Sequence, residues 1–284
     1  MSCTPIKCFH LFILSICLLY QKQSLAESKV GDLRIIGGNV VTNRSHFAYQ
    51  ASISYRTYHF CGGTIISENK ILTAAHCSIY ENGYNFNLRE LKVIVSHLKL
   101  NSAAKIYSVS KVIPHPNFDR STMQNDIAIL KIRSSFEPWS EMVQPIPLSK
   151  NLPVPSTNCI ISGWGKLDEN EAGGSNDLRS AYVQILKCEQ FLASSIIKMG
   201  MFCAGSFTGE TDSCQGDSGG PLVCNNTLVG IVSWGVGCGR PRLPGVYTDV
   251  SRYLDWIAES CSMGTSSLSL TCVSFISLVI LLLK

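Results

Sequence analysis

Several signatures of other protein classes are missing from this chain. It has no Cys-x-x-Cys and no His-Glu-x-x-His spacing, so its 13 cysteines do not indicate a metal site. Lys and Arg form no cluster along the sequence, which argues against nucleic acid or heparin as a partner. The chain also contains no internal repeat and no low-complexity tract. We expect neither a metal nor a cofactor.

Apolar runs of the length of a membrane span are absent too, and the two shorter runs lie near the ends. Residues 1–26 combine a basic residue, an apolar core and the small-residue site Ser24-Leu25-Ala26. This pattern is typical of a secretory signal peptide, which is removed from the mature protein. An uncleaved anchor is the alternative.

The C-terminal segment, residues 260–284, has a different pattern. Small and polar residues precede an apolar run from Leu268 to Leu283, which Lys284 closes. The run has about 16 residues, whereas a spanning helix needs roughly 20. Small residues, a polar spacer and a hydrophobic tail are typical of a signal for a glycosylphosphatidylinositol (GPI) anchor. We predict attachment at Ser260, with a short transmembrane anchor as the alternative.

The distribution of cysteines fits the same processing. Three of the 13 cysteines lie in residues 1–26 and ten follow Ile35. In a secreted protein, these ten indicate disulfides. Attachment of the anchor at Ser260 removes Cys261 and Cys272 and leaves eight, an even set. Attachment at Ser262 would instead leave Cys261 without a partner.

The segment between the processed ends, residues 35–259, is long enough for one compact domain with a substantial core. Short β-rich runs such as Gln50–Tyr55 and Leu228–Ser233 are separated by turn residues, which indicates an all-β barrel or sandwich. Without the leader, the propeptide and Lys284, the formal charge falls from +4 to +1. Sequons for N-glycosylation begin at Asn43 and Asn225.

The most informative segment is Asp212–Pro221, which places Ser218 in a glycine-rich turn directly after two carboxylates, Asp212 and Asp217. Its glycines allow turns in which backbone N–H groups converge near the Ser218 hydroxyl, as an oxyanion hole requires. A serine hydroxyl needs a base, and the base needs a third group that orients it. His76, among small residues beside Cys77, and Asp126, before an apolar run, are the candidates.

Together, in the order His, Asp, Ser, these segments resemble the trypsin-like (chymotrypsin-fold) serine proteases over about residues 35–259. The resemblance implies two six-stranded Greek-key β-barrels, with the active site in the cleft between them, and a short C-terminal helix. It also implies that Ser218 attacks the scissile carbonyl, that His76 transfers the proton and that Asp126 orients the imidazole. Gly216 and Ser218 would donate the N–H groups of the oxyanion hole.

The resemblance further implies a preference for basic substrates. Asp212 lies six residues before Ser218, where the family has the floor of its primary specificity pocket. A buried carboxylate there is satisfied best by the guanidinium of Arg or the ammonium of Lys. Glycines in the walls leave room for a long side chain. The residues implied for substrate binding are Asp212, Ser213, Ser233, Gly235 and Gly245.

The segment Arg34–Gly38 resembles the activation junction of the family's zymogens. Cleavage after Arg34 would release the propeptide, residues 27–34, and free the α-amino group of Ile35. In the family, this ammonium pairs with the carboxylate beside the nucleophile, here Asp217. Because breaking a buried ion pair costs about 3–5 kcal/mol, one cleavage can order the site. Self-activation and another trypsin-like protease are both compatible with Arg34.

The family resemblance also implies disulfides and the absence of a calcium site. The implied pairs are Cys61–Cys77, Cys159–Cys224, Cys188–Cys203 and Cys214–Cys238. Calcium needs several oxygen ligands, which commonly include carboxylates. Residues 91–118, where calcium-binding relatives carry those carboxylates, contain no Asp or Glu. We therefore predict no calcium there.

The leading hypothesis is a secreted serine endopeptidase, held at the cell surface and activated from a zymogen. It acts on protein or peptide substrates after Arg or Lys. A second hypothesis is a catalytically silent homologue that serves as a protein-binding module. The complete set of candidate catalytic residues favours the enzyme. A freely secreted digestive-type trypsin is a third possibility, which the apolar tail disfavours.

Overall fold

The computed structural model describes residues 35–79, 86–102 and 104–262. The predicted signal peptide, the propeptide with Arg34 and the apolar tail after residue 262 lie outside these residues. Within the described part of the chain, no helix is both long and apolar enough to cross a membrane.

The first half of the fold is a closed antiparallel barrel. Its strands are β2 (Gln50–Tyr55), β3 (Tyr58–Ser67), β4 (Lys70–Thr73), β5 (Leu91–Val95), β6 (Lys105–Pro114) and β7 (Ala128–Ile132). They neighbour one another in the order β2-β3-β4-β7-β6-β5, and β5 closes the barrel on β2. Alternation along β5 explains its placement, since Leu91, Val93 and Val95 are buried while Lys92 and Ile94 are partly exposed.

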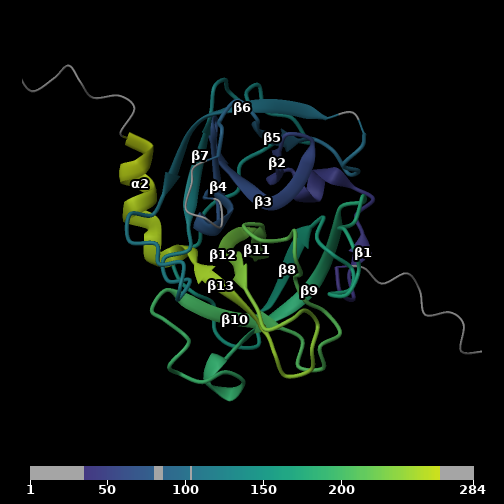
Figure 1. Ribbon diagram of the computed structural model, residues 1–284, viewed down its shortest axis with the longest axis vertical. Coiled ribbons are helices and arrows are strands. Elements are labelled where there is room, and N and C mark those ends of the chain that lie inside the picture. Colours follow the sequence, from purple (N-terminus) through teal and green to yellow (C-terminus); the bar gives the residue numbers. More distant parts are fainter. Residues whose placement is uncertain (1–34, 80–85, 103, 263–284) are drawn as a thin grey trace, which may run out of the picture. The chain divides into compact units, whose positions relative to one another are not determined.

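The second half is a barrel of the same kind. Its strands are β8 (Asn158–Gly163), β9 (Arg179–Leu186), β10 (Met201–Gly205), β11 (Pro221–Cys224), β12 (Thr227–Trp234) and β13 (Gly245–Asp249). Their order, β8-β9-β10-β13-β12-β11, repeats that of the first barrel, and the β8–β9 pairing completes it. The short strand β1 (Asn39–Val40) adds to the edge of β9. The prediction of two six-stranded barrels is confirmed (Figure 1).

Short helical segments connect the strands. Four are 3-10 helices, η1 (Arg44–Phe47), η2 (Ala75–Cys77), η3 (Cys188–Gln190) and η4 (Val250–Tyr253). The chain continues from η4 into the α-helix α2 (Leu254–Ser262), as the family resemblance implies. Although it follows the second barrel in sequence, α2 packs on the first, where His115 contacts the rings of Tyr253 and Trp256. In Figure 1, α2 lies beside β7.

Buried hydrogen bonds join the two barrels. The Ser162 hydroxyl on β8 donates to the Gln50 side chain on β2 at 2.6 Å, and both residues are buried. The Gly62 N–H on β3 donates to the Ser218 carbonyl at 2.8 Å. Polar groups paired inside a protein hold a defined geometry, because an unpaired one is costly. The barrels are therefore held in register at the segment that carries Ser218.

Candidate active site

His76 and Asp126 are brought together by the pairing of two strands. His76 lies in η2, just after β4, and Asp126 lies just before β7; β4 and β7 pair with Thr73 opposite Ala128. The His76 Nδ1 lies 2.8 Å from Asp126 Oδ2, and the His76 N–H donates to Asp126 Oδ1 at 2.9 Å. An Nδ1–H that donates to the carboxylate leaves Nε2 as the proton acceptor.

The second barrel supports Asp126 from the other side. Asp126 is fully buried, and the Ser233 hydroxyl donates to its Oδ2 at 2.6 Å. The Thr248 hydroxyl donates to its backbone carbonyl at 2.8 Å. From the sequence, Ser233 is expected only to line the substrate pocket, and its hydrogen bond to Asp126 carries no local sequence signal. Two barrels thus fix the carboxylate that orients His76.

The turn before Ser218 depends on a glycine. Gly216 has φ of +102°, a conformation that residues with a Cβ rarely adopt, and a Cβ there would lie 3.0 Å from the Cα of Gly165. The turn is closed by the Asp217 N–H, which donates to the Cys214 carbonyl at 2.9 Å. Ser218 follows directly, and Gly216 and Ser218 line the same cavity.

Two cavities meet at Ser218. The larger, of about 900 Å³, is lined by residues that include His76, Gly216 and Ser218. The smaller, of about 210 Å³, is lined by residues that include Asp212 and Ser218. The structure therefore brings the predicted nucleophile, base, oxyanion-hole residues and pocket floor to one connected site. The other residues predicted for substrate binding, Ser213, Ser233, Gly235 and Gly245, also line the smaller cavity.

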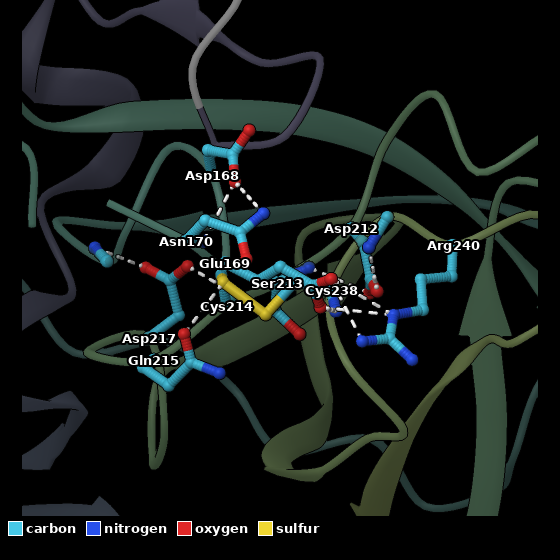
Figure 2. Close-up of a disulfide and its surroundings, with 12 residues drawn as sticks. Asp168, Glu169, Asn170, Asp212, Ser213, Cys214, Gln215, Asp217, Cys238 and Arg240 are labelled. Atoms are coloured by element: carbon cyan, nitrogen blue, oxygen red, sulfur yellow. Dashed lines mark hydrogen bonds and ion pairs between the residues drawn. A yellow bond between two sulfur atoms is a disulfide. The ribbon is translucent and has the colours of Figure 1, made fainter. Parts of the chain in front are cut away.

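Asp212 is buried in the smaller cavity without a cationic partner among the described residues. Only 3% of Asp212 is exposed, and its carboxylate accepts hydrogen bonds from the N–H groups of Ser213 at 2.8 Å and Gly239 at 2.9 Å. Burial raises the pKa of Asp212 to about 7, because the charged form loses its hydration. A Cβ on Gly245 would lie 3.1 Å from Asp212 Oδ1, so a side chain there would occupy the space above the acid. Figure 2 shows Asp212 beside Ser213 and the Cys214–Cys238 disulfide.

Asp217 is a second buried acid, on the other side of the turn. It is 2% exposed and accepts hydrogen bonds from the N–H groups of Gly165 at 2.8 Å and Cys214 at 3.0 Å (Figure 2). Burial raises the pKa of Asp217 to about 6. Ile35 is 1% exposed within the core of the second barrel, and the Ile36 carbonyl accepts from the Asp212 N–H at 3.2 Å. The start of the described chain therefore lies against the segment that contains both acids.

His59 is a site residue that the sequence analysis missed. Its ring nitrogens lie 2.8 Å from the Ser52 hydroxyl and 3.0 Å from the Gly216 carbonyl oxygen. Burial lowers the pKa of His59 to about 4, so the ring is neutral and donates one N–H. Because the peptide group is planar and trans, the Gly216 carbonyl held toward His59 directs the Asp217 N–H the opposite way, and that N–H donates to the Cys214 carbonyl. No local motif marks this role, because its partners come from β2 and the Ser218 loop.

His97 is a second buried histidine that lies outside the predicted site residues. It is 2% exposed and stacks on Trp164, with ring centroids 4.7 Å apart. Burial lowers the pKa of His97 to about 4. A neutral imidazole is the form that fits between apolar and aromatic neighbours.

The structure contains the four disulfides that the family resemblance implies, namely Cys61–Cys77, Cys159–Cys224, Cys188–Cys203 and Cys214–Cys238. The first ties β3 to the turn that carries His76. Cys61, His76 and Cys77 cluster closely enough for a metal ion. Both sulfurs are consumed in the disulfide, however, so no thiolate is available as a ligand.

The predicted modification sites have contrasting surroundings. Asn43 caps η1, where its side chain accepts from the Ser45 N–H at 3.0 Å, and Asn225 lies in the turn between β11 and β12. Both are exposed, as a glycan would require. Ser260 lies near the end of α2 and is only 6% exposed.

Comparison with known proteins agrees with this geometry. A family model described as Trypsin matches residues 35–257. Trypsin II-P29 of Gallus gallus is 39% identical over 232 residues, which cover 81% of this chain and 90% of that protein. Serine protease 1 of Homo sapiens and anionic trypsin of Canis lupus familiaris are each 38% identical over 251 residues, which cover 87% of this chain and 98% of each protein.

Proposed function

The chain belongs to the trypsin family of serine proteases, and we propose that it is a secreted, zymogen-activated endopeptidase that cleaves peptide bonds after Arg or Lys. The observation that carries the proposal is the placement of Asp212. This buried acid lacks a cationic partner among the described residues and lines a cavity of about 210 Å³ that also contains Ser218. A cation that enters this cavity would bring its neighbouring peptide bond to Ser218.

The proposed reaction has two steps. In the first, Ser218 Oγ attacks the peptide carbonyl carbon while His76 Nε2 takes the hydroxyl proton, and Asp126 stabilises the resulting imidazolium. The N–H groups of Gly216 and Ser218 stabilise the negative oxygen of the tetrahedral intermediate. His76 then protonates the departing amine, which leaves an acyl-enzyme on Ser218. In the second step, water attacks the acyl-enzyme with the same proton transfers and releases the acid.

Specificity is proposed to come from charge pairing at Asp212. An unpaired buried carboxylate is costly, and a substrate guanidinium or ammonium removes this cost with charge-assisted hydrogen bonds. The raised pKa of Asp212 reflects the same cost in the empty cavity. Phe or Leu in the pocket would leave the acid unpaired, so we expect poor cleavage after apolar residues.

Activation is proposed to follow cleavage after Arg34. The new ammonium of Ile35 would pair with Asp217, whose carboxylate is buried and holds the backbone of the Ser218 turn. The position of Ile35, buried in the same half of the molecule, supports this route. Because the pair forms only after the cut, the proenzyme is expected to be nearly inactive.

The cellular setting is part of the proposal. Four disulfides between described cysteines suit an oxidising, extracellular environment. We propose that residues 1–26 direct secretion and that residues 261–284 are exchanged for a GPI anchor on Ser260 at the cell surface. The mature protease would then act on proteins in the extracellular space around the cell.

The proposal is tested by cutting the purified proenzyme after Arg34 and comparing amide substrates with Arg, Lys, Phe or Leu before the scissile bond. We expect turnover with Arg and Lys only. The matched control is Ser218→Ala, which should lower turnover by about 10⁶-fold. A cut wild-type protein with no more activity than this control would favour the binding-module hypothesis. Preference for Phe would show that Asp212 does not set specificity.

A further inference from the structure

The outer face of the first barrel carries a row of lysines that the proposed reaction does not use. Antiparallel pairing places Lys131 on β7 opposite both Lys111 on β6 and Lys70 on β4. Residues directly opposite each other point to the same face of a sheet, with Cβ atoms about 4.5–5.5 Å apart. Three lysines therefore form one line across three neighbouring strands.

A second row of polar residues runs beside the first. Lys92 on β5 pairs with Ser108 on β6, and the Arg133 N–H, just after β7, donates to the Ser108 carbonyl at 2.9 Å. The Lys92 ammonium donates to the Ser108 hydroxyl at 3.0 Å. An irregularity in β6 between Val109 and Lys111 keeps Ser108 and Lys111 on the same side. We call the five basic residues of the two rows, Lys70, Lys92, Lys111, Lys131 and Arg133, the lysine face.

The opposite side of the same strands fills the barrel. Val93, Val109, Leu130 and Ile132 alternate with the basic residues and are each at most 2% exposed. This alternation fixes the direction of the lysine face, since a shift of one residue would bury the charges. Lys111 and Arg133 are exposed, and Lys92 and Lys131 are partly exposed. Lys70 is 9% exposed.

The charges of the lysine face are not neutralised within the described protein. Among the described residues, no ion pair involves any of its five members. Like charges directly opposite each other destabilise a sheet. A bound polyanion would remove this repulsion and so would bind preferentially to the folded barrel. The formal charge between the processed ends is only +1, so the excess of positive charge is local.

We propose that the lysine face binds an extended sulfated polysaccharide. The positive groups lie in neighbouring rows on a sheet surface, with the Ser108 hydroxyl beside Lys92 in the second row, which suits a chain with regularly spaced sulfates. Ile106 is the one large apolar residue of these four strands that is strongly exposed in the described part of the chain, so insertion into a bilayer is not favoured. Exposed aromatic platforms for bases are also missing from the described residues of these strands.

This inference does not depend on the proposed hydrolytic function. None of the five residues lines either cavity at Ser218. A polysaccharide on the lysine face would therefore leave the candidate active site open. It would concentrate the protein where such polymers are abundant, with an affinity that falls as salt rises.

The test uses heparin as the probe and the full processed chain, with Ser218→Ala in every sample to prevent self-digestion. The double variant Lys111→Gln/Lys131→Gln is compared with Lys150→Gln/Lys187→Gln, which removes two exposed lysines from elsewhere. We expect the first pair to weaken heparin binding about tenfold and to lower the log–log salt slope by about two. The second double variant should have nearly the same heparin affinity and salt slope as the parent protein.

Several results would overturn the proposal. These are equal losses in the two double variants, or parent binding no tighter to heparin than to neutral dextran. Binding to phosphatidylserine vesicles or to duplex DNA that is as tight as heparin binding, and is lost in the same variant, would assign the face to another partner class. A second test uses the protein without lysine substitutions. The acetylation of each lysine is measured by mass spectrometry with and without heparin. Heparin should protect Lys92, Lys111 and Lys131 but not Lys150 or Lys187, and uniform labelling would contradict the inference.

Discussion

Asp212 is a buried acid whose charge depends on what occupies the pocket. Its pKa is raised to about 7 by burial, so without a bound cation the Asp212 carboxyl group is partly protonated near neutral pH. With a raised pKa, the contribution of this group to folding stability is complete below about pH 4 and is lost as the pH rises through about 7. A bound cation favours the ionised acid, so binding should release a proton.

This residue therefore predicts the pH dependence of ligand binding. The affinity for benzamidine, which stays cationic across the range, should fall as the pH is lowered from 8 to 6. Calorimetry in buffers of different ionisation enthalpy would measure the released proton. Asp212→Ser should bind benzamidine weakly at every pH and should release no proton on binding. Equal affinity of the wild-type protein at both pH values would contradict the assignment.

Single residues also show where sequence reasoning succeeds and where it ends. The segments that contain His76, Asp126 and Ser218 each carry a local pattern, and the structure brings all three to one site. His59 and Ser233 carry no such pattern for the roles described here. Their hydrogen bonds to Gly216 and Asp126 depend on strand register across 157 and 107 residues of sequence. Such contacts follow from the assembled barrels and not from local spacing.

At the scale of elements, an ion pair links two loops of the second barrel. Glu169 lies between β8 and β9, and Arg240 lies between β12 and β13. The Glu169 carboxylate accepts from Arg240 at 2.9 and 3.1 Å and from the Cys238 N–H at 3.1 Å (Figure 2). The next N–H in the chain, of Gly239, donates to Asp212. We infer that Glu169 positions the loop that holds the Asp212 carboxylate.

We predict that Glu169→Gln raises KM for an Arg substrate about two- to fivefold and leaves kcat nearly unchanged. The loosened loop would weaken the hold on Asp212 without touching Ser218 or His76. Steady-state kinetics on one Arg amide would separate KM from kcat. The matched control is Lys99→Gln, which breaks the pair of Lys99 with Asp177 at 3.3 Å. If both variants show the same small rise in KM, Glu169 does not contribute to specificity.

The lysine face marks a limit of sequence reasoning at the same scale. Its five members are spread over residues 70–133, so the chain shows no basic cluster when it is read in order. They gather only because β4, β7, β6 and β5 are neighbours in the barrel. Period-two alternation identifies Lys92 and Lys131 as outward facing, but Lys111 joins them only through the irregularity in β6, and the pairing that aligns the lysines requires the strand order.

For the whole molecule, we predict that one cleavage controls activity through Asp217. Cutting after Arg34 should raise kcat/KM by about 10²–10⁴-fold, the equivalent of forming one buried ion pair. Asp217→Asn should remain near the level of the proenzyme after the same cut, because it cannot pair with the new ammonium. The rate of hydrolysis of an Arg amide, measured for the wild-type protein and for Asp217→Asn before and after cleavage, tests both expectations.

The control for this prediction is Asp255→Asn, which removes one negative charge from the exposed side of α2. It should activate as the wild-type protein does. Full activation of Asp217→Asn would show that the new N-terminus acts elsewhere. N-terminal sequencing of each sample would verify that the cut is complete and begins at Ile35.

The overall architecture is only partly visible in the sequence. Alternating apolar residues and frequent turns predict an all-β fold, and the family resemblance supplies two six-stranded barrels. The two barrels share one strand order, yet the sequence shows no repeat. Strand order is set by contacts between distant segments, and many apolar sequences satisfy the same inward-facing positions. Architecture can therefore repeat where side chains do not.

The ends of the described chain cross over between the barrels. Strand β1 near the start adds to β9 of the second barrel, while η4 and α2 at the end pack on the first, where the Tyr253 hydroxyl of η4 donates to Asn125 at 3.0 Å. Each barrel thus packs against a segment that belongs, in chain order, to the half of the chain that forms the other barrel. If the connection over residues 133–157 were cut, we expect the two fragments to stay associated, because each barrel holds a segment of the other fragment. The cleft between the barrels would then keep its shape.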